Sequence, residues 1–170
     1  KQENLAGNVS VNLMPASIQD PEFVTWLSST LLSRPKLANR LLFELDDYGI
    51  SQNLYAALNL QQAIASTGAG IGIDHFGRNI TALSSLGALK PAYLKIDGSF
   101  IRNIDTNRDN QQFVELLVTM AHAQDILVIA ESIENDNEME MVRKLRVDGL
   151  QGYALHRPEV WISNIPETLK

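Results

Sequence analysis

Short apolar runs alternate with segments of helical spacing along almost the whole chain, and this alternation most constrains the fold. Each run is the length of a strand, whereas in the intervening segments apolar residues recur every three or four positions. Phe23, Leu27 and Leu31 show the helical spacing. Short apolar strands alternating with helices are typical of a parallel sheet covered by helices. The predicted strands are Val9 to Leu13, Leu41 to Leu45, Gly70 to Ile73, Ala92 to Ile96, Ile126 to Ala130 and Gly149 to Ala154.

Two architectures contain such a sheet, a doubly wound open sheet and a (β/α)₈ barrel. A dinucleotide-binding open sheet needs a glycine-rich loop after a strand, whereas Gly68, Gly70 and Gly72 precede or lie within one. A complete barrel has eight strands in roughly 200–250 residues. The six strand units in 170 residues therefore predict a (β/α)₈ TIM-like barrel that is N-terminally truncated. No Pro-, Gly- or Ser-rich linker divides residues 1–170, so we expect a single domain.

The composition excludes several classes of function. The chain has no cysteine, which excludes a disulfide framework, a thiolate zinc site and a cysteine nucleophile. A formal net charge of −6 argues against a broad nucleic-acid surface, since that affinity depends on Lys and Arg. No apolar run reaches the roughly 18 residues of a membrane span. We expect a cytoplasmic domain that makes no membrane contact through this segment.

Polar side chains close the predicted strands one after another. The carboxyl ends of barrel strands meet at one mouth, where barrel enzymes place their chemistry. One carboxylate at a strand end is commonly a helix cap, but its recurrence on successive strands favours a shared metal or phosphate site. Oxygen ligands suit Mg²⁺ or Mn²⁺, which can activate water against a phosphodiester. The residues concerned are Asn12, Glu44, Asp47, Asp74, Lys95, Asp97, Glu131 and Gln151.

Six ordered motifs resemble the EAL domain, a family that hydrolyses the bacterial messenger cyclic di-GMP. Its usual motifs are close to VNLS, LEITE, DDFGTG, LKIDRSF, AEGVE and QGYLFSRP. The resemblance covers essentially the whole chain and implies a TIM-like barrel of the EAL type. The matching segments are VSVNL (9–13), FELDD (43–47), IDHFG (73–77), YLKIDGSFI (93–101), IAESIE (129–134) and LQGYALHRP (150–158).

The resemblance also implies roles for individual residues. Asn12, Glu44 and Asp74 match metal ligands of the family, and Asp47 stands at a further candidate ligand position. Two residues match the catalytic centre: Lys95 the lysine that orients the attacking water, and Glu131 a glutamate at the metal centre. Gln151 matches a glutamine beside the substrate.

Three departures suggest that this centre is vestigial. His75 replaces the second aspartate, which in active relatives holds the second metal ion. An imidazole offers one neutral nitrogen and repels a cation when protonated, so affinity for Mg²⁺ falls. A purely structural role for His75 stays open at this stage. Arg78 lies in the loop Gly77 to Thr81, where the family has a Gly-Thr-Gly loop, and Ser132 replaces a glycine.

The Glu-Ala-Leu signature itself is not in the sequence, so we expect it on a first strand upstream of Lys1. No cofactor is therefore expected, or Mg²⁺ or Mn²⁺ if the vestigial site still binds metal.

The Asp-His pair, together with RLLFELDDYGIS and FIRNIDTNRDNQQFV, is similar to the CsrD/MshH group of degenerate EAL proteins. That similarity implies a non-catalytic regulatory domain that acts by protein–protein interaction in small regulatory RNA decay through RNase E. It implies as partners the RNase E machinery or a sugar-transport phosphocarrier protein, with inner-membrane anchoring through an N-terminal region of the full-length protein. The alternatives are a cyclic di-GMP receptor or a weakly active cyclic di-GMP phosphodiesterase, and a homodimer is a candidate arrangement.

Overall fold

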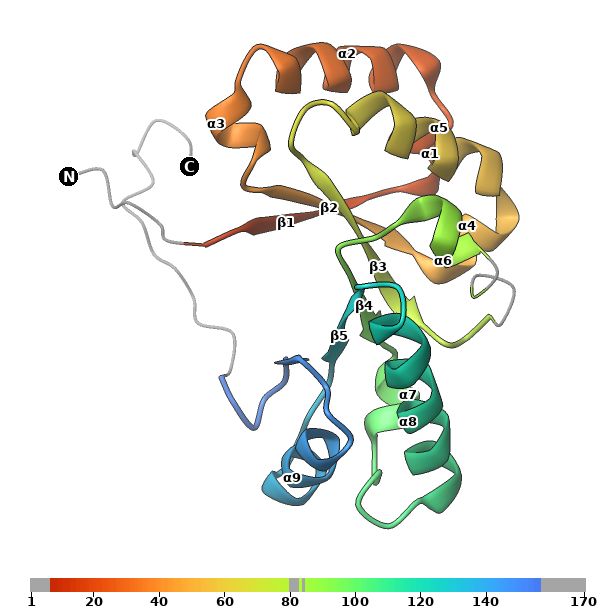
Figure 1. Cartoon of the computed structure of the whole chain (residues 1–170), viewed down its shortest axis with the longest axis vertical. Helices are drawn as coiled ribbons and strands as arrows, with labels where there is room; N and C mark the ends of the chain where they lie inside the picture. The colour runs from red at the N-terminus through yellow and green to blue at the C-terminus, as the bar shows by residue number, and fades with distance from the viewer. Residues whose placement is uncertain (1–6, 80–82, 84, 157–170) are drawn as a thin grey trace, which may run out of the picture.

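One parallel sheet forms the frame of the molecule. The computed structural model describes residues 7–79, 83 and 85–156. Within this part, six strands lie in sequence order and every neighbouring pair is parallel. Figure 1 shows the strand direction turning steadily from β1 to β5. The strands are β1 (Val9–Leu13), β2 (Leu41–Asp46), β3 (Gly70–Phe76), β4 (Tyr93–Ile96), β5 (Leu127–Ala130) and β6 (Gly149–Leu150).

This strand order decides between the two predicted architectures. A doubly wound sheet reverses its strand order at a switch point, whereas a barrel wall adds each new strand beside the last. The described strands follow the second pattern without a reversal. The predicted TIM-barrel-like α/β fold is therefore confirmed.

Helices fill the connections between the strands. Asp20 caps α2 by accepting a hydrogen bond from the Glu22 N–H, with Pro21 in the first turn. Asp136 stands before an acidic first turn and is the cap that the sequence predicts, but Asn135 caps α9. None of the helices in the described ranges is long and apolar enough to cross a membrane. The helices are α1 (Pro15–Ile18), α2 (Pro21–Leu32), α3 (Pro35–Ala38), α4 (Asp47–Gln52), α5 (Leu54–Ile64), α6 (Leu86–Leu89), α7 (Gly98–Ile101), α8 (Arg108–His122) and α9 (Asp136–Lys144).

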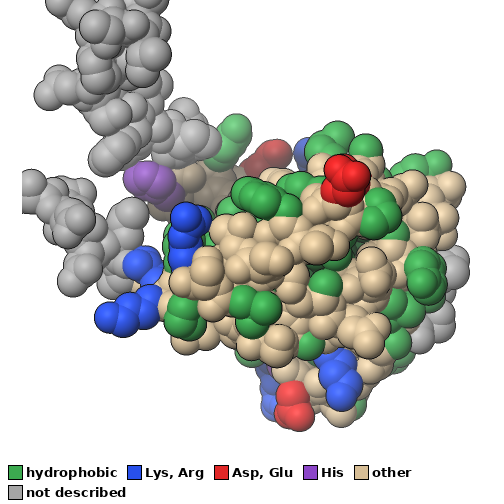
Figure 2. All heavy atoms as spheres, turned by 90° about the horizontal axis from the view of Figure 1, so that it is seen from above, with side chains coloured by type: hydrophobic (Ala, Val, Ile, Leu, Met, Phe, Trp, Pro, Cys, Tyr) green, Lys and Arg blue, Asp and Glu red, His purple; other side chains and the backbone are tan. Residues whose placement is uncertain are grey.

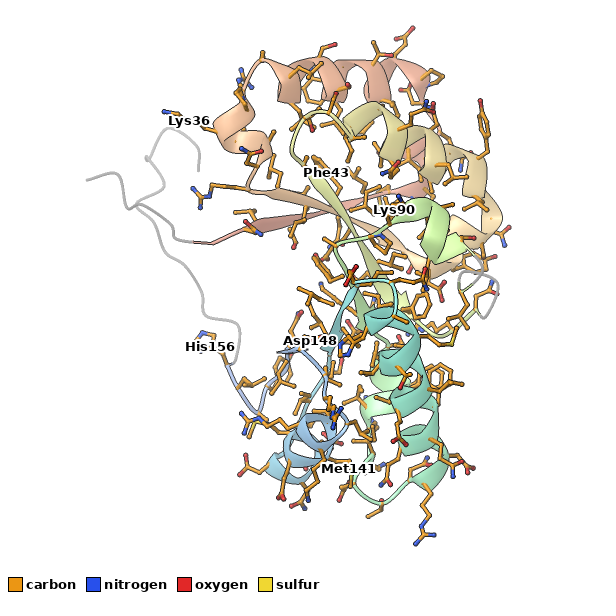
Figure 3. The ribbon with its side chains drawn as sticks, viewed as in Figure 1. Lys36, Phe43, Lys90, Met141, Asp148 and His156 are labelled. Carbon is orange, nitrogen blue, oxygen red and sulfur yellow. The ribbon has the colours of Figure 1, made fainter. Side chains whose placement is uncertain are left out.

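The sheet has an apolar face and a polar face. Successive side chains of a strand point to opposite faces, so the buried apolar residues of β2 to β5 share one face. Phe43, labelled in Figure 3, belongs to this face. The intervening positions carry the polar residues that the sequence singled out. The main apolar residues are Phe43, Leu45, Ile71, Ile73, Leu94, Ile96, Val128 and Ala130.

Some predicted boundaries and faces were wrong. β3 runs three residues beyond Ile73, and β6 ends at Leu150 because the chain then turns back onto Ile133. The helical spacing of Leu54, Leu58 and Ala65 predicts that they share one buried face, but Leu54 of α5 is 37% exposed. The helix instead buries two alanines, a leucine and an isoleucine, a stripe whose small residues weaken the apolar signal. These four are Ala56, Ala57, Leu60 and Ile64.

Candidate functional site

A buried ion pair lies on the polar face, between β2 and β4. Lys95 Nζ is 2.6 Å from Glu44 Oε1, and the Tyr93 hydroxyl donates to the same oxygen at 2.5 Å. Tyr93 Oη is also 2.7 Å from Ser10 Oγ of β1. Glu44 is only 4% exposed. The Glu44 carboxylate is therefore engaged from two sides by groups of the protein itself.

A glycine on the strand between them allows Tyr93 to reach Glu44. Gly72 is level with Glu44 on one side and with Tyr93 on the other. A Cβ at position 72 would lie 2.5 Å from the Tyr93 ring, so any side chain there would displace it. The phenol thus crosses β3 over the gap that Gly72 leaves.

The charge state of Glu44 follows from these contacts. Burial alone would raise its pKa, but the hydrogen bonds from Lys95 and Tyr93 outweigh burial and hold the pKa below its usual value. Burial and the neighbouring Glu44 raise the pKa of the Tyr93 phenol. Glu44 is therefore an anion and Tyr93 a neutral donor at neutral pH.

A second cluster surrounds His75 at the carboxyl ends of β3 to β5. His75 Nδ1 is 3.0 Å from Glu131 Oε1 and 3.3 Å from Asp97 Oδ2. Its Nε2 is 3.9 Å from Asp74 Oδ2. Arg78 Nε is 2.8 Å from the same oxygen of Asp97. Two protein cations, one of them conditional on ring protonation, thus face three carboxylates.

Local backbone geometry places this cluster. The β3–β4 register shifts between Ile73 and Phe76, and His75 adopts a left-handed φ of +53°. This irregularity in β3 coincides with the turn of the imidazole toward Asp97 and Glu131. Glu131 also accepts a hydrogen bond from the Gly98 N–H at 3.3 Å.

The pKa values in this cluster move in different directions. Burial disfavours the charged ring of His75, but Asp74 and Glu131 outweigh burial and raise its pKa. Burial raises the pKa of Glu131, although the neighbouring His75 acts to lower it. Burial opposes ionisation of Asp97, yet the hydrogen bonds from Ser99 and the charge of Arg78 lower its pKa.

The donor set bears directly on metal binding. Asp74, His75 and Glu131 each offer one ligand atom, and these atoms lie within 4.8 Å of one another. A two-ion centre needs further carboxylates, but Glu44 is engaged by Lys95 and Asp97 by Arg78. Asp74, His75 and Glu131 can therefore offer ligands to one divalent ion, and the two further carboxylates nearby are paired with cations of the protein.

Asp47, the further candidate ligand, is engaged on one side by the backbone of the loop after β3. It is fully buried, and its Oδ2 accepts hydrogen bonds from the backbone N–H groups of Gly77 at 3.3 Å and Asn79 at 3.0 Å. Burial raises the pKa of Asp47, against these two hydrogen bonds. Asp47 thus fastens the start of the loop after β3, whose Ile80 and Thr81 lie outside the described residues.

Two further predicted site residues, Asn12 and Gln151, lie at the edge of the site. Asn12 is level with Glu44 in the sheet and is exposed. Gln151 follows β6 and lines a hollow of about 260 Å³ together with Glu131, Ser132 and Tyr153. Neither belongs to the cluster around His75.

Sequence reasoning brought together Glu44, Asp74, Lys95 and Glu131, which the structure places on one face. It missed Tyr93 and Ser10, which hold Glu44 in place. The available signal was the period of two along a strand, because each lies two residues before a residue already singled out, Lys95 and Asn12.

Residues 1–158 match the sequence model of the EAL domain. The chain belongs to the EAL family. It is 33% identical over 162 residues to the cyclic di-GMP phosphodiesterase PdeF of Escherichia coli, a match that covers 95% of this chain and 22% of that protein. The chain thus spans less than a quarter of the length of this relative.

Solved EAL structures share the fold. The FimX EAL domain of Pseudomonas aeruginosa bound to c-di-GMP aligns with a TM-score of 0.82 and 27% identity, covering 89% of this chain and 62% of the other. A manganese and cyclic di-GMP complex of Klebsiella pneumoniae BlrP1 aligns with a TM-score of 0.76 and 26% identity, covering 86% and 38%.

Proposed function

We propose that this EAL domain regulates by binding and does not hydrolyse cyclic di-GMP. The observation that supports the proposal is the position of His75, whose ring nitrogen lies 3.0 Å from Glu131 and 3.3 Å from Asp97. The EAL motif has an aspartate at this position. A side chain that occupies the carboxylates leaves them unavailable for a second ion.

The chemical consequence is large. In a two-ion centre, the pair of ions stabilises both the attacking and the leaving oxygen of a phosphodiester. Loss of one ion removes several kcal/mol of that stabilisation, and each 1.4 kcal/mol or so is tenfold in rate. Lys95, whose family counterpart orients the water, is held 2.6 Å from Glu44. We therefore assign Lys95 and Glu131 as remnants of a catalytic centre.

Within the family, we assign the domain to the CsrD/MshH group. The Asp74-His75 pair and the segment around Arg102 support this assignment by their sequence. On this assignment the domain contacts the RNase E machinery or a sugar-transport phosphocarrier protein and promotes decay of small regulatory RNAs. The full-length protein is then anchored to the inner membrane through an N-terminal region.

A second candidate function is that of a cyclic di-GMP receptor. The FimX EAL domain is described as bound to c-di-GMP, and it aligns over 89% of this chain. The hollow beside Gln151 and Tyr153 lies at the same end of the sheet as the His75 cluster. An exposed aromatic ring at a polar hollow suits stacking of a nucleobase.

The test uses the full-length protein with Mg²⁺ or Mn²⁺, and Escherichia coli PdeF as a positive control. We expect no hydrolysis of cyclic di-GMP above background, and no recovery in His75→Asp, because Arg78 and Ser132 also depart from the motif. Metal-dependent turnover by the unaltered protein would overturn the proposal. Calorimetric titration with the dinucleotide then separates a receptor, which binds it saturably, from a domain that binds only protein.

A further inference from the structure

The carboxylates of the site are unevenly matched by cations of the protein. Glu44 and Asp97 each have a lysine or arginine nitrogen within 2.8 Å. Within the described residues, Asp74 and Glu131 have only weaker counter-charges. The nearest lysine Nζ is 3.9 Å from Asp74, and the group 3.0 Å from Glu131 is the ring of His75, which is charged only when protonated. When the ring is neutral, two negative charges remain, and one divalent ion would balance them.

This gathering of carboxylates is a local feature and not a simple result of an acidic chain. The net charge is −6, yet Figure 2 shows a face, the one over α2, on which the acidic side chains are few and lie apart from one another. At the strand ends, by contrast, one ligand atom from each of Asp74, His75 and Glu131 lies within 4.8 Å of the others. A histidine among closely spaced carboxylates is the donor set of a metal ion with affinity for nitrogen.

The contacts of His75 decide which of its ring nitrogens can bind an ion. Nδ1 lies 3.0 Å from Glu131 Oε1 and 3.3 Å from Asp97 Oδ2, so in the neutral ring this nitrogen carries the proton. Nε2 then keeps its lone pair, and it lies 3.9 Å from Asp74 Oδ2. An ion about 2.1 Å from each of these two atoms bridges that distance. A histidine ligand whose other nitrogen donates to a carboxylate is the usual arrangement in metal sites.

The two carboxylates are each oriented through one oxygen. Asp74 Oδ1 accepts a hydrogen bond from the His75 backbone N–H at 3.1 Å, and Glu131 Oε1 accepts one from the Gly98 N–H at 3.3 Å. A carboxylate has two oxygens, so each side chain keeps a second one for an ion. Ligands that are held before the ion arrives lose less freedom when it binds.

We propose that Asp74, His75 and Glu131 form a site for one zinc-class ion, by which we mean Zn²⁺, Co²⁺ or Ni²⁺, in preference to Mg²⁺. Imidazole nitrogen suits these metals, whereas Mg²⁺ prefers a shell of oxygen atoms. The histidine therefore changes which metal this position takes and does not merely weaken the position. The assignment goes beyond the proposed function, which concerns hydrolysis and not the identity of the ion.

The test is calorimetric titration of the full-length protein with Zn²⁺, Co²⁺ and Mg²⁺, for the unaltered chain, His75→Asp and His122→Ala. Aspartate tolerates the left-handed φ of +53° at position 75 better than most residues, so the variant should fold. His122 is the matched control. Its side chain is 39% exposed against 41% for His75, and its Nε2 is 2.8 Å from Asp148, but it belongs to no group of three ligands among the described residues.

A second readout is the proton magnetic resonance spectrum of the Co²⁺ form. The ring N–H of a histidine that binds Co²⁺ through its other nitrogen gives a strongly shifted signal that exchanges with solvent. We expect this signal from the unaltered protein and from His122→Ala, and we expect it to be absent from His75→Asp.

We expect Zn²⁺ to bind at least about a hundredfold more tightly than Mg²⁺. His75→Asp should lower the affinity for Zn²⁺ at least about tenfold and raise the affinity for Mg²⁺. Equal affinities for the two metals, a preference that His75→Asp leaves unchanged, or a shifted signal that disappears with His122→Ala would overturn the inference. Turnover of cyclic di-GMP by the same preparation would refute the proposed function and leave the metal assignment standing.

Discussion

The carboxylates in the two halves of the site are paired with different kinds of side chain. On the β2 side, Glu44 is 4% exposed and is matched by one lysine at 2.6 Å and one phenol. On the β3–β5 side, Asp74, Asp97 and Glu131 are faced by His75 and Arg78, whose side chains are 41% and 60% exposed. The first half is closed and paired, whereas the second is open, and the side chains that face its carboxylates are more exposed, with His75 charged only when protonated.

This difference coincides with the positions at which the sequence departs from the usual EAL motifs. The Glu44–Lys95 pair sits on residues that match the EAL motifs, and Gly72 leaves room for the Tyr93 phenol. His75, Arg78 and Ser132 all belong to the open half, and all three depart from the motifs. Substitutions there leave the core packing intact, because these side chains reach solvent. On the proposed function, binding of a second ion is the property that the open half lacks.

The largest effect is expected from Lys95→Met in the closed half. Removing the cation leaves Glu44 as a buried, partly uncompensated charge, which should cost about 3 kcal/mol in the free energy of unfolding. Urea denaturation at neutral pH measures it. Lys144→Met is the matched control, because Lys144 Nζ is also within 2.8 Å of a glutamate but both side chains are over 60% exposed. We expect no measurable change there. Equal effects at the two lysines would break the comparison.

Asp97→Asn probes the open half through pH. The pKa of Asp97 is lowered in the folded protein, so its charge stabilises the fold above its ordinary pKa of about 4. That contribution is lost as the pH falls through the lower folded pKa. At pH 7 we expect the variant to be about 2 kcal/mol less stable, since the lost hydrogen bonds were to a charged group. The gap should shrink below pH 4, as followed by denaturation at several pH values; a constant gap would contradict the assignment.

The smallest effect is expected from Ser132→Gly. Ser132 has a φ of +60°, a conformation that costs a residue with a Cβ about 1 kcal/mol relative to glycine. Relief of that strain should raise the free energy of unfolding by about 0.5 kcal/mol, after the entropy of glycine in the unfolded chain is counted. The same change at Ser29, inside α2, should lower it by about 0.5 kcal/mol. Loss of stability at position 132 would show that the hydroxyl makes a needed contact.

How far the sequence could predict the fold is clear from two strands. The bounds of β1 are those that its apolar run predicts. β3 was predicted to end at Ile73, because Asp74 and His75 interrupt the apolar run although the backbone continues to Phe76. The hydrophobic pattern locates a strand, but it does not show where the strand ends when its last residues are polar site residues.

The sequence predicted which residues belong to the site, but not which side chains pair with one another. Glu44 and Lys95 were both identified, yet their 2.6 Å pairing depends on strand register, which the sequence does not state. The sequence pattern places Tyr93 in an apolar strand and does not indicate that its hydroxyl donates a hydrogen bond to Glu44. Asp47 matched a ligand position, but burial and two backbone N–H groups engage it with the loop after β3.

The central claim is that His75 takes the place of a second metal ion, and counting bound Mn²⁺ tests it most directly. Electron paramagnetic resonance titration of the full-length protein gives the number of ions bound with and without His75→Asp. We predict that the unaltered protein binds no more than one ion at this site and that the aspartate variant binds one more. Two ions bound by the unaltered protein would contradict the account.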